Sequence, residues 1–209
     1  MPAYRLILFD FDGTLADSAD WMIRTFNAMA PQFGLRSVSE AEVEMLRGRS
    51  NREIIGYLGV PMWKIPRIAA EMTRRVAAQA ESISLFEGTG TMLQTLHAAG
   101  IRLAIVSSNA EDNIRRILGA DNAALISDFD CGASLFGKSH KLRNVLRRSG
   151  IPAHEAICIG DETRDIEAAR EAGMDSGAVL WGYAKPDVLR TFKPSRIFES
   201  MSSLASLAD

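Results

Sequence analysis

The sequence has little of what marks nucleic-acid-binding, membrane or secreted proteins. Its 209 residues carry 24 basic and 26 acidic side chains, so it lacks the basic excess of a nucleic-acid footprint. No stretch approaches the roughly 18 apolar residues of a membrane span, and a strand-like run so near the first residue argues against a signal peptide. Cys131 and Cys158, the 2 cysteines, lack metal-type spacing and are expected to be core residues in a reducing compartment. We therefore expect a cytoplasmic protein that binds neither nucleic acid nor membranes.

Hydrophobic residues make up 47% of the chain, enough for one large domain with a smaller insertion. Short apolar runs alternate with segments of helical period, such as the stripe formed by Ile114, Ile117 and Leu118. The runs that we interpret as strands are 5–9, 103–106 and 156–159, with further candidates at 124–126, 178–180 and 196–198. Near-continuous apolar runs are typical of parallel strands buried on both faces, so the alternation predicts a doubly wound α/β sheet.

One region breaks this alternation. Between about residues 17 and 85 we expect no strand, and the helical periods predict helices at 21–29, 39–46, 51–58 and 65–80. The pattern indicates a helical insertion directly after the first strand. We therefore divide the chain into an α/β core, residues 1–16 and 86–209, and a helical domain, residues 17–85.

Polar residues follow the three clearest strands. Asp10 and Asp12 follow the first, Ser107, Ser108 and Asn109 follow the second, and Asp161 follows the third. Because ligands bind outside the carboxyl ends of strands in parallel α/β sheets, these side chains are expected to share one site.

A cluster of Asp10, Asp12, Asp161 and Asp165 would be unfavourable without a cation, because like charges raise one another's pKa. Mg²⁺ prefers such oxygen ligands and bridges to phosphate, so we expect these four residues to bind it. A carboxylate such as Asp10 can attack a phosphate ester and form an aspartyl-phosphate. Asp12 can then protonate the leaving oxygen and later deprotonate water.

Phosphate also needs hydrogen-bond donors and positive charge. We expect donors from Ser107, Asn109 and the backbone N–H groups near Gly13 and Ser108, and Gly13 also permits a tight turn. Lys138, after Phe136-Gly137, is the preferred cation, and Lys141 is its rival one turn later.

The sequence around these residues resembles the haloacid dehalogenase superfamily of phosphatases. Asp-Phe-Asp-Gly-Thr-Leu at 10–15 resembles its first motif, Ser107 its second, Lys138 its third, and Gly-Asp-Glu-Thr-Arg-Asp at 160–165 its fourth. The resemblance implies a Rossmann-like core whose helical insertion is a cap over the site. It also implies that Asp10 is nucleophile and metal ligand, that Asp12 is acid/base and binds metal through its carbonyl, and that Asp161 binds metal directly. Asp165 would then act through water or by orienting its neighbours, and Ser107 and Lys138 would hold the phosphoryl group.

The resemblance also narrows the function. Phosphoglycolate-phosphatase-like enzymes are the expected nearest relatives, and Trp-Gly-Tyr at 181–183 is similar to that group. The expected partner is a small phosphorylated metabolite, either phosphoglycolate-like or a sugar phosphate, and the expected assembly is a monomer or homodimer. Arg47 and Arg49 are candidate substrate-binding residues in the insertion.

Three other functions stay open at this point. A sugar-phosphate mutase similar to β-phosphoglucomutase would use the same core residues, and the sequence around Arg47 and Arg49 fits either enzyme. A dehalogenase is disfavoured, because that branch lacks an acidic residue at the position of Asp12. A non-catalytic phosphate-binding protein is disfavoured by the complete carboxylate set.

Overall fold

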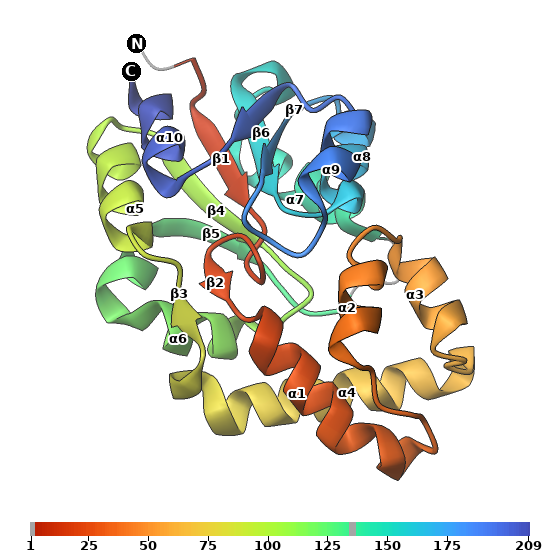
Figure 1. The fold of residues 1–209 in the computed structure, drawn as a ribbon. Helices are drawn as coiled ribbons and strands as arrows, with labels where there is room; N and C mark the ends of the chain where they lie inside the picture. Colours follow the sequence, from red (N-terminus) through yellow and green to blue (C-terminus); the bar gives the residue numbers. More distant parts are fainter. Residues whose placement is uncertain (1–2, 134–136) are drawn as a thin grey trace.

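The computed structural model describes residues 3–133 and 137–209, and a six-stranded parallel sheet forms its centre (Figure 1). The strand order is β5-β4-β1-β6-β7-β8. In that order the strands are Ile126–Asp130, Arg102–Val106, Leu6–Phe9, Ala156–Gly160, Asp175–Val179 and Arg196–Phe198. The first strand of the chain is therefore central, between β4 and β6, which end directly before Ser107 and Asp161.

Helices cover both faces of the sheet because both faces of its central strand are apolar. Ile7 and Phe9 of β1 pack in a core with helices from 89–98, 111–124 and 201–205, whereas Leu6 and Leu8 pack in a second core with helices from 137–149 and 163–172. Successive side chains of a strand point to opposite faces, so one apolar strand anchors both layers. The helices of these layers are α5 Thr89–Ala98, α6 Glu111–Ala124, α7 Gly137–Ser149, α8 Thr163–Ala172, α9 Pro186–Thr191 and α10 Met201–Ala205, with 3-10 turns η4 Ala153–Glu155 and η5 Ser206–Ala208.

The helical insertion begins and ends at a small antiparallel pair, β2 (Ala16–Asp17) with β3 (Ser84–Leu85). Figure 1 shows its helices on the side of the sheet toward which the β1 arrow points. The elements between the two short strands are α1 Ala19–Met29, η1 Ala30–Phe33, α2 Glu40–Leu46, α3 Asn51–Tyr57, η2 Met62–Lys64, α4 Ile65–Gln79 and η3 Ala80–Ser82. We use "cap" below for residues 17–85. That the cap is a separate domain stays a prediction.

The predicted fold class is confirmed: a doubly wound parallel sheet with helices on both faces and a helical segment after the first strand. Three details were wrong. The strand predicted at 178–180 begins earlier, at Asp175, and ends at Val179. Residues 124–125 end a helix and its turn, and the strand runs on to Asp130, because half-exposed polar residues in this edge strand interrupt the apolar pattern. The pair β2–β3 was also missed, since two-residue strands are too short to show an alternating pattern. None of the helices in the described ranges combines the length and apolarity needed to cross a membrane.

Candidate functional site

The carboxyl ends of three neighbouring strands bring the predicted residues together. Asp10 follows β1, Ser107 follows β4, and Asp161 follows β6, and all three side chains are buried. Pairing of β1 with both β4 and β6 fixes this proximity. The site is therefore set by the sheet itself.

Asp10 is a buried carboxylate with one oxygen held and one oxygen free. Its Oδ1 accepts a hydrogen bond from the backbone N–H of Phe11 at 2.8 Å. Its Oδ2 accepts no hydrogen bond from the described residues, although Lys138 Nζ lies 3.1 Å away. Attack on phosphorus needs an oxygen whose electron pairs are not engaged, and Oδ2 meets that condition.

Lys138 is the cation nearest to this oxygen. Its Nζ donates to Asp165 Oδ1 at 2.6 Å, and its side chain is only 12% exposed. Burial lowers the pKa of Lys138, but Asp10 and Asp165 outweigh it and the net pKa is raised. Lys138 is therefore charged at neutral pH.

Asp161 is fully buried beneath the loop that begins with Asp10. Its Oδ1 accepts a hydrogen bond from Thr14 Oγ1 at 2.8 Å, and its Oδ2 accepts one from the backbone N–H of Tyr183 at 2.7 Å. Gly13 has a φ of 78°, and a Cβ at Gly13 would lie 2.3 Å from Asp161 Oδ2. Only glycine fits this close approach. Burial and the charge of Asp10 raise the pKa of Asp161 well above its ordinary value.

Asp165 hydrogen-bonds both the start of α8 and Lys138. Its Oδ2 accepts from the backbone N–H of Glu162 at 2.9 Å, which completes a capping box at the start of α8. Its Oδ1 pairs with Lys138. Asp165 thus fixes the cation that faces Asp10.

Asp12 is held through both of its oxygens. Ser18 Oγ donates to Oδ1 at 2.9 Å, and Asn109 Nδ2 donates to Oδ2 at 3.2 Å. When Asp12 is ionised, the one hydroxyl proton of Ser18 is used in its bond to Asp12, so the phenol of Tyr183, 2.7 Å from Ser18 Oγ, is then the donor of that pair. Burial, followed by the charge of Asp10, raises the pKa of Asp12 to about 6, and these hydrogen bonds oppose the rise.

The carboxyl groups fit a divalent cation. Asp10, Asp161 and Asp165 each offer an oxygen within 4.8 Å of the others. Buried carboxyl groups without a cation take up protons, which is the direction of the Asp161 pKa shift. Hard oxygen donors of this kind suit Mg²⁺. Lys138 occupies Asp165 Oδ1 with its positive charge, whereas the partners of Asp161 are a neutral hydroxyl and a backbone N–H, so Asp10 and Asp161 are the better candidates for direct ligands.

Ser107 and Asn109 lie in the loop after β4, next to the carboxylates. Ser107 Oγ accepts from the backbone N–H of Asn109 at 3.1 Å, which leaves the hydroxyl proton of Ser107 available to a ligand. The amide of Asn109 reaches Asp12. Ser108, in contrast, is exposed.

Lys138 and Lys141, the two candidates for the phosphate-holding lysine, make different contacts in the structure. Lys141 Nζ donates to the backbone carbonyls of Ser107, Asp130 and Gly132, so it joins the loops after β4 and β5. Lys138 alone of the two contacts Asp10. Phe136, which helped to select Lys138, lies outside the described residues.

The two cap arginines are not brought to the carboxylates. Arg47 donates to the backbone carbonyls of Gly182 and Tyr183, at 3.1 Å and 2.9 Å, and so joins the cap to the loop beside Asp161. Arg49 is exposed and pairs with Glu53 at 3.3 Å. Their roles as substrate-binding residues stay predictions.

Sequence reasoning missed several members of the site: Thr14, Ser18, Tyr183 and Arg164. Thr14 belongs to the first motif, and its hydroxyl could have been assigned from that position. Arg164 lies within the fourth motif, and its Nη2 is 4.0 Å from Asp10 Oδ2. Ser18 and Tyr183 are 165 residues apart, and only the fold brings their hydroxyls together.

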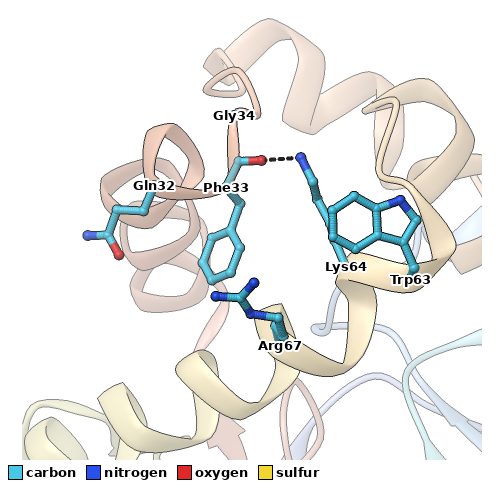
Figure 2. A pocket seen from close by; sticks show the side chains of 6 residues that line it. All are labelled: Gln32, Phe33, Gly34, Trp63, Lys64 and Arg67. Carbon is cyan, nitrogen blue, oxygen red and sulfur yellow. Dashed lines mark hydrogen bonds between the residues drawn. The ribbon is translucent and has the colours of Figure 1, made fainter.

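A separate hollow of about 260 Å³ lies on the cap (Figure 2). Figure 2 shows Lys64 donating to the carbonyl of Phe33 across it, and Trp63 and Arg67 also line it. Its lining comes from η1, η2 and α4 and includes no carboxylate. It therefore lacks the groups that the strand-end site provides for phosphate chemistry.

Comparison with known proteins agrees with this geometry. Residues 7–179 match the family model described as haloacid dehalogenase-like hydrolase. The chain is 33% identical over 201 residues to a phosphoglycolate phosphatase of Synechococcus elongatus, covering 96% of this chain and 95% of that protein. It is also 30% identical over 190 residues to the tyrosine-protein kinase PtkA of Mycobacterium tuberculosis, covering 88% of this chain and 65% of the kinase. CbbY from Rhodobacter sphaeroides, solved in complex with phosphate, superposes with a TM-score of 0.77 at 25% identity over 96% of each chain.

Proposed function

Because this chain belongs to the haloacid dehalogenase-like hydrolase family, we propose that it hydrolyses a small phosphate monoester through a phosphoryl group carried on Asp10, with Mg²⁺ as cofactor. It is a phosphatase, a phosphoric monoester hydrolase, of the phosphoglycolate-phosphatase-like kind. The observation that carries the proposal is Asp10 Oδ2, buried, without a hydrogen bond from the described residues and 3.1 Å from Lys138.

The residues divide the work in two steps. Asp10 Oδ2 forms a bond to phosphorus while the ester oxygen leaves and takes a proton from Asp12. Water then attacks this phosphorus, the bond between phosphorus and Asp10 Oδ2 breaks to release inorganic phosphate, and Asp12 takes a proton from the attacking water. A pKa of about 6 suits a group that must both give and accept a proton near neutral pH.

The other groups stabilise charge. Lys138 and the hydroxyl of Ser107 offer positive charge and a donor to the phosphoryl oxygens, as charge-dominated phosphoryl transfer requires. A bound Mg²⁺ would be held by Asp10 and Asp161, with Asp165 acting through water, and would neutralise charge between carboxylate and phosphate. Thr14 and the Tyr183 backbone orient Asp161 for this role.

For the substrate we propose a small ester such as 2-phosphoglycolate. Curated relatives of 33% and 34% identity carry that activity in their names. A sugar phosphate is the other substrate class, and cap residues decide between the two classes.

The test is phosphate release across a panel of 2-phosphoglycolate, sugar phosphates and p-nitrophenyl phosphate, each with Mg²⁺ and with EDTA. We expect Mg²⁺-dependent release of free phosphate, fastest with a small monoester. Isomerised sugar phosphate without free phosphate would indicate a mutase instead, and phosphate transferred to tyrosine would indicate a kinase. Halide release from a 2-haloacid would indicate a dehalogenase, and phosphate binding without any turnover would indicate a binding protein.

A further inference from the structure

Arg164 faces the same oxygen of Asp10 that we propose as the attacking atom. Its Nη2 lies 4.0 Å from Asp10 Oδ2, and Lys138 Nζ lies 3.1 Å from that atom. Arg164 comes from the first turn of α8, whereas Lys138 comes from α7. Two cations from different helices therefore flank one oxygen.

Lys138 and Arg164 differ in their exposure and in how many of their N–H donors are already paired. The Lys138 side chain is 12% exposed, and its amine lies between Asp10 and Asp165. The Arg164 side chain is 43% exposed, and its one hydrogen bond to a described residue runs from Nη2 to Glu162 Oε1 at 2.7 Å. A guanidinium carries five N–H donors, so most of those of Arg164 remain for a ligand.

The position of Arg164 suits the phosphoryl group rather than the remainder of a substrate. For in-line attack, phosphorus must lie roughly 3–3.5 Å from Asp10 Oδ2. Its non-bridging oxygens then fall within reach of a donor 4.0 Å from the same atom. The planar fork of arginine matches two phosphate oxygens at once, which a lysine ammonium does not.

We propose that Arg164 binds the phosphoryl group undergoing transfer and, after hydrolysis, the inorganic phosphate product. This inference rests on the proposed function, because it assumes that phosphorus approaches Asp10. Glu162 holds the guanidinium in position before substrate arrives. Lys138, held by Asp165, and the more exposed Arg164 would then both offer positive charge to the phosphoryl group.

The test compares Arg164→Gln and Arg164→Lys with a matched control, Arg5→Gln. Arg5 is also an exposed arginine paired with a glutamate, Glu155, at 2.8 Å, and it precedes β1 at the opposite end of the strand from the site. The measurements are kcat, KM, inhibition by inorganic phosphate, and melting temperature, with p-nitrophenyl phosphate and 2-phosphoglycolate as substrates.

We expect Arg164→Gln to lower kcat/KM and to raise the inhibition constant of inorganic phosphate by about 10- to 100-fold, the size of a lost charge-assisted hydrogen bond. Arg164→Lys should recover part of both losses, since it restores charge without the fork. In Arg164→Gln, kcat/KM should fall by the same factor for both substrates, because they share only the phosphoryl group. Arg5→Gln should change neither kcat/KM nor the inhibition constant of inorganic phosphate.

An unchanged phosphate inhibition constant in a folded Arg164→Gln would overturn the inference. A loss confined to 2-phosphoglycolate would also overturn it, because the contact would then be with the carboxylate. If Arg164→Gln does not fold, the Arg164→Lys comparison decides in the same way.

The same measurements distinguish the inference from the proposed function. If the wild type hydrolyses the esters and the Arg164 variants are unaffected, only the inference is rejected. If the wild type hydrolyses no ester but phosphate binding weakens in Arg164→Gln, only the proposed function is rejected, and if neither turnover nor weakened binding is seen, the inference and the proposed function are both rejected.

Discussion

Carboxyl groups in the cap and at the strand ends have opposite surroundings. In the cap, hydrogen bonds from Arg74 and Arg75 lower the pKa of Glu71 to about 2. At the strand ends, burial and the charge of Asp10 raise the pKa of Asp12 to about 6. Glu71 is paired with arginines of its own helix, whereas the charge of Asp10 acts on both Asp12 and Asp161 at the strand ends.

The contrast separates ordinary ion pairs on the surface of the cap from the buried carboxyl groups for which we propose a chemical role. Exposed pairs such as Arg74–Glu71 are ordinary helix surface and contribute little to folding. Buried like charges destabilise a fold unless a cation joins them, so their presence favours a function that needs them.

Among the changes around these carboxyl groups, Lys138→Met should have the largest combined effect on kcat and stability. It removes the buried cation and keeps the volume of the side chain. Removing one stabiliser of transition-state charge costs roughly 10²–10³ in kcat. In Mg²⁺-free buffer the variant should also lose about 3 kcal/mol in its free energy of unfolding, since Asp10 and Asp165 lose their partner. Steady-state kinetics and urea unfolding measure the two effects. Activity within a factor of three of wild type would refute the assignment of Lys138.

Adding Mg²⁺ should stabilise the folded protein, by about 2.7 kcal/mol at a hundred times its dissociation constant. The raised pKa of Asp161 means that the folded state holds a proton above pH 3.8, where the unfolded state releases it. Without metal, stability therefore falls as pH rises through this range, and the same holds for Asp12 up to about pH 6.

Because protons and Mg²⁺ compete for these carboxyl groups, the rise in melting temperature on adding Mg²⁺ should be larger at pH 7.5 than at pH 5.5. Thermal melts with Mg²⁺ and with EDTA measure it. Asp161→Asn, which removes one proposed ligand, is the control and should lose most of the shift. An equal shift at both pH values would contradict the proposed metal site.

The smallest effect is expected in the cap, from Arg74→Ala. The Arg74 side chain is 68% exposed, and Arg75 also pairs with Glu71 at 2.7 Å. The free energy of unfolding should change by about 0.5 kcal/mol or less, with kcat unaltered. A loss above roughly 1 kcal/mol, by urea unfolding, would mean that cap ion pairs carry more stability than exposed pairs usually do.

The sequence predicted the sheet and the strand-end residues because both depend on short-range patterns. Apolar runs located β1, β4 and β6, and Asp10, Ser107 and Asp161 follow directly from where those strands stop. Edge strand β5 escaped this rule because half-exposed polar residues break its pattern.

What the sequence could not predict depends on long-range packing. The hydroxyl chain from Tyr183 through Ser18 to Asp12 joins residues far apart in the chain. The hydrogen bonds of Arg47 to two backbone carbonyls near residue 182 could not be predicted either, and its role in substrate binding stays a prediction. Side-chain direction of this kind is fixed by tertiary contacts, which a local pattern does not encode.

The most direct test of the account is phosphate release by Asp10→Asn on the ester that wild type hydrolyses fastest, with Mg²⁺ present and Asp10→Ala as a check against deamidation. The account predicts a loss of about 10⁴-fold or more in kcat, with an unchanged circular dichroism spectrum. Appreciable steady-state hydrolysis by both folded variants would contradict the assignment of Asp10 as the nucleophile.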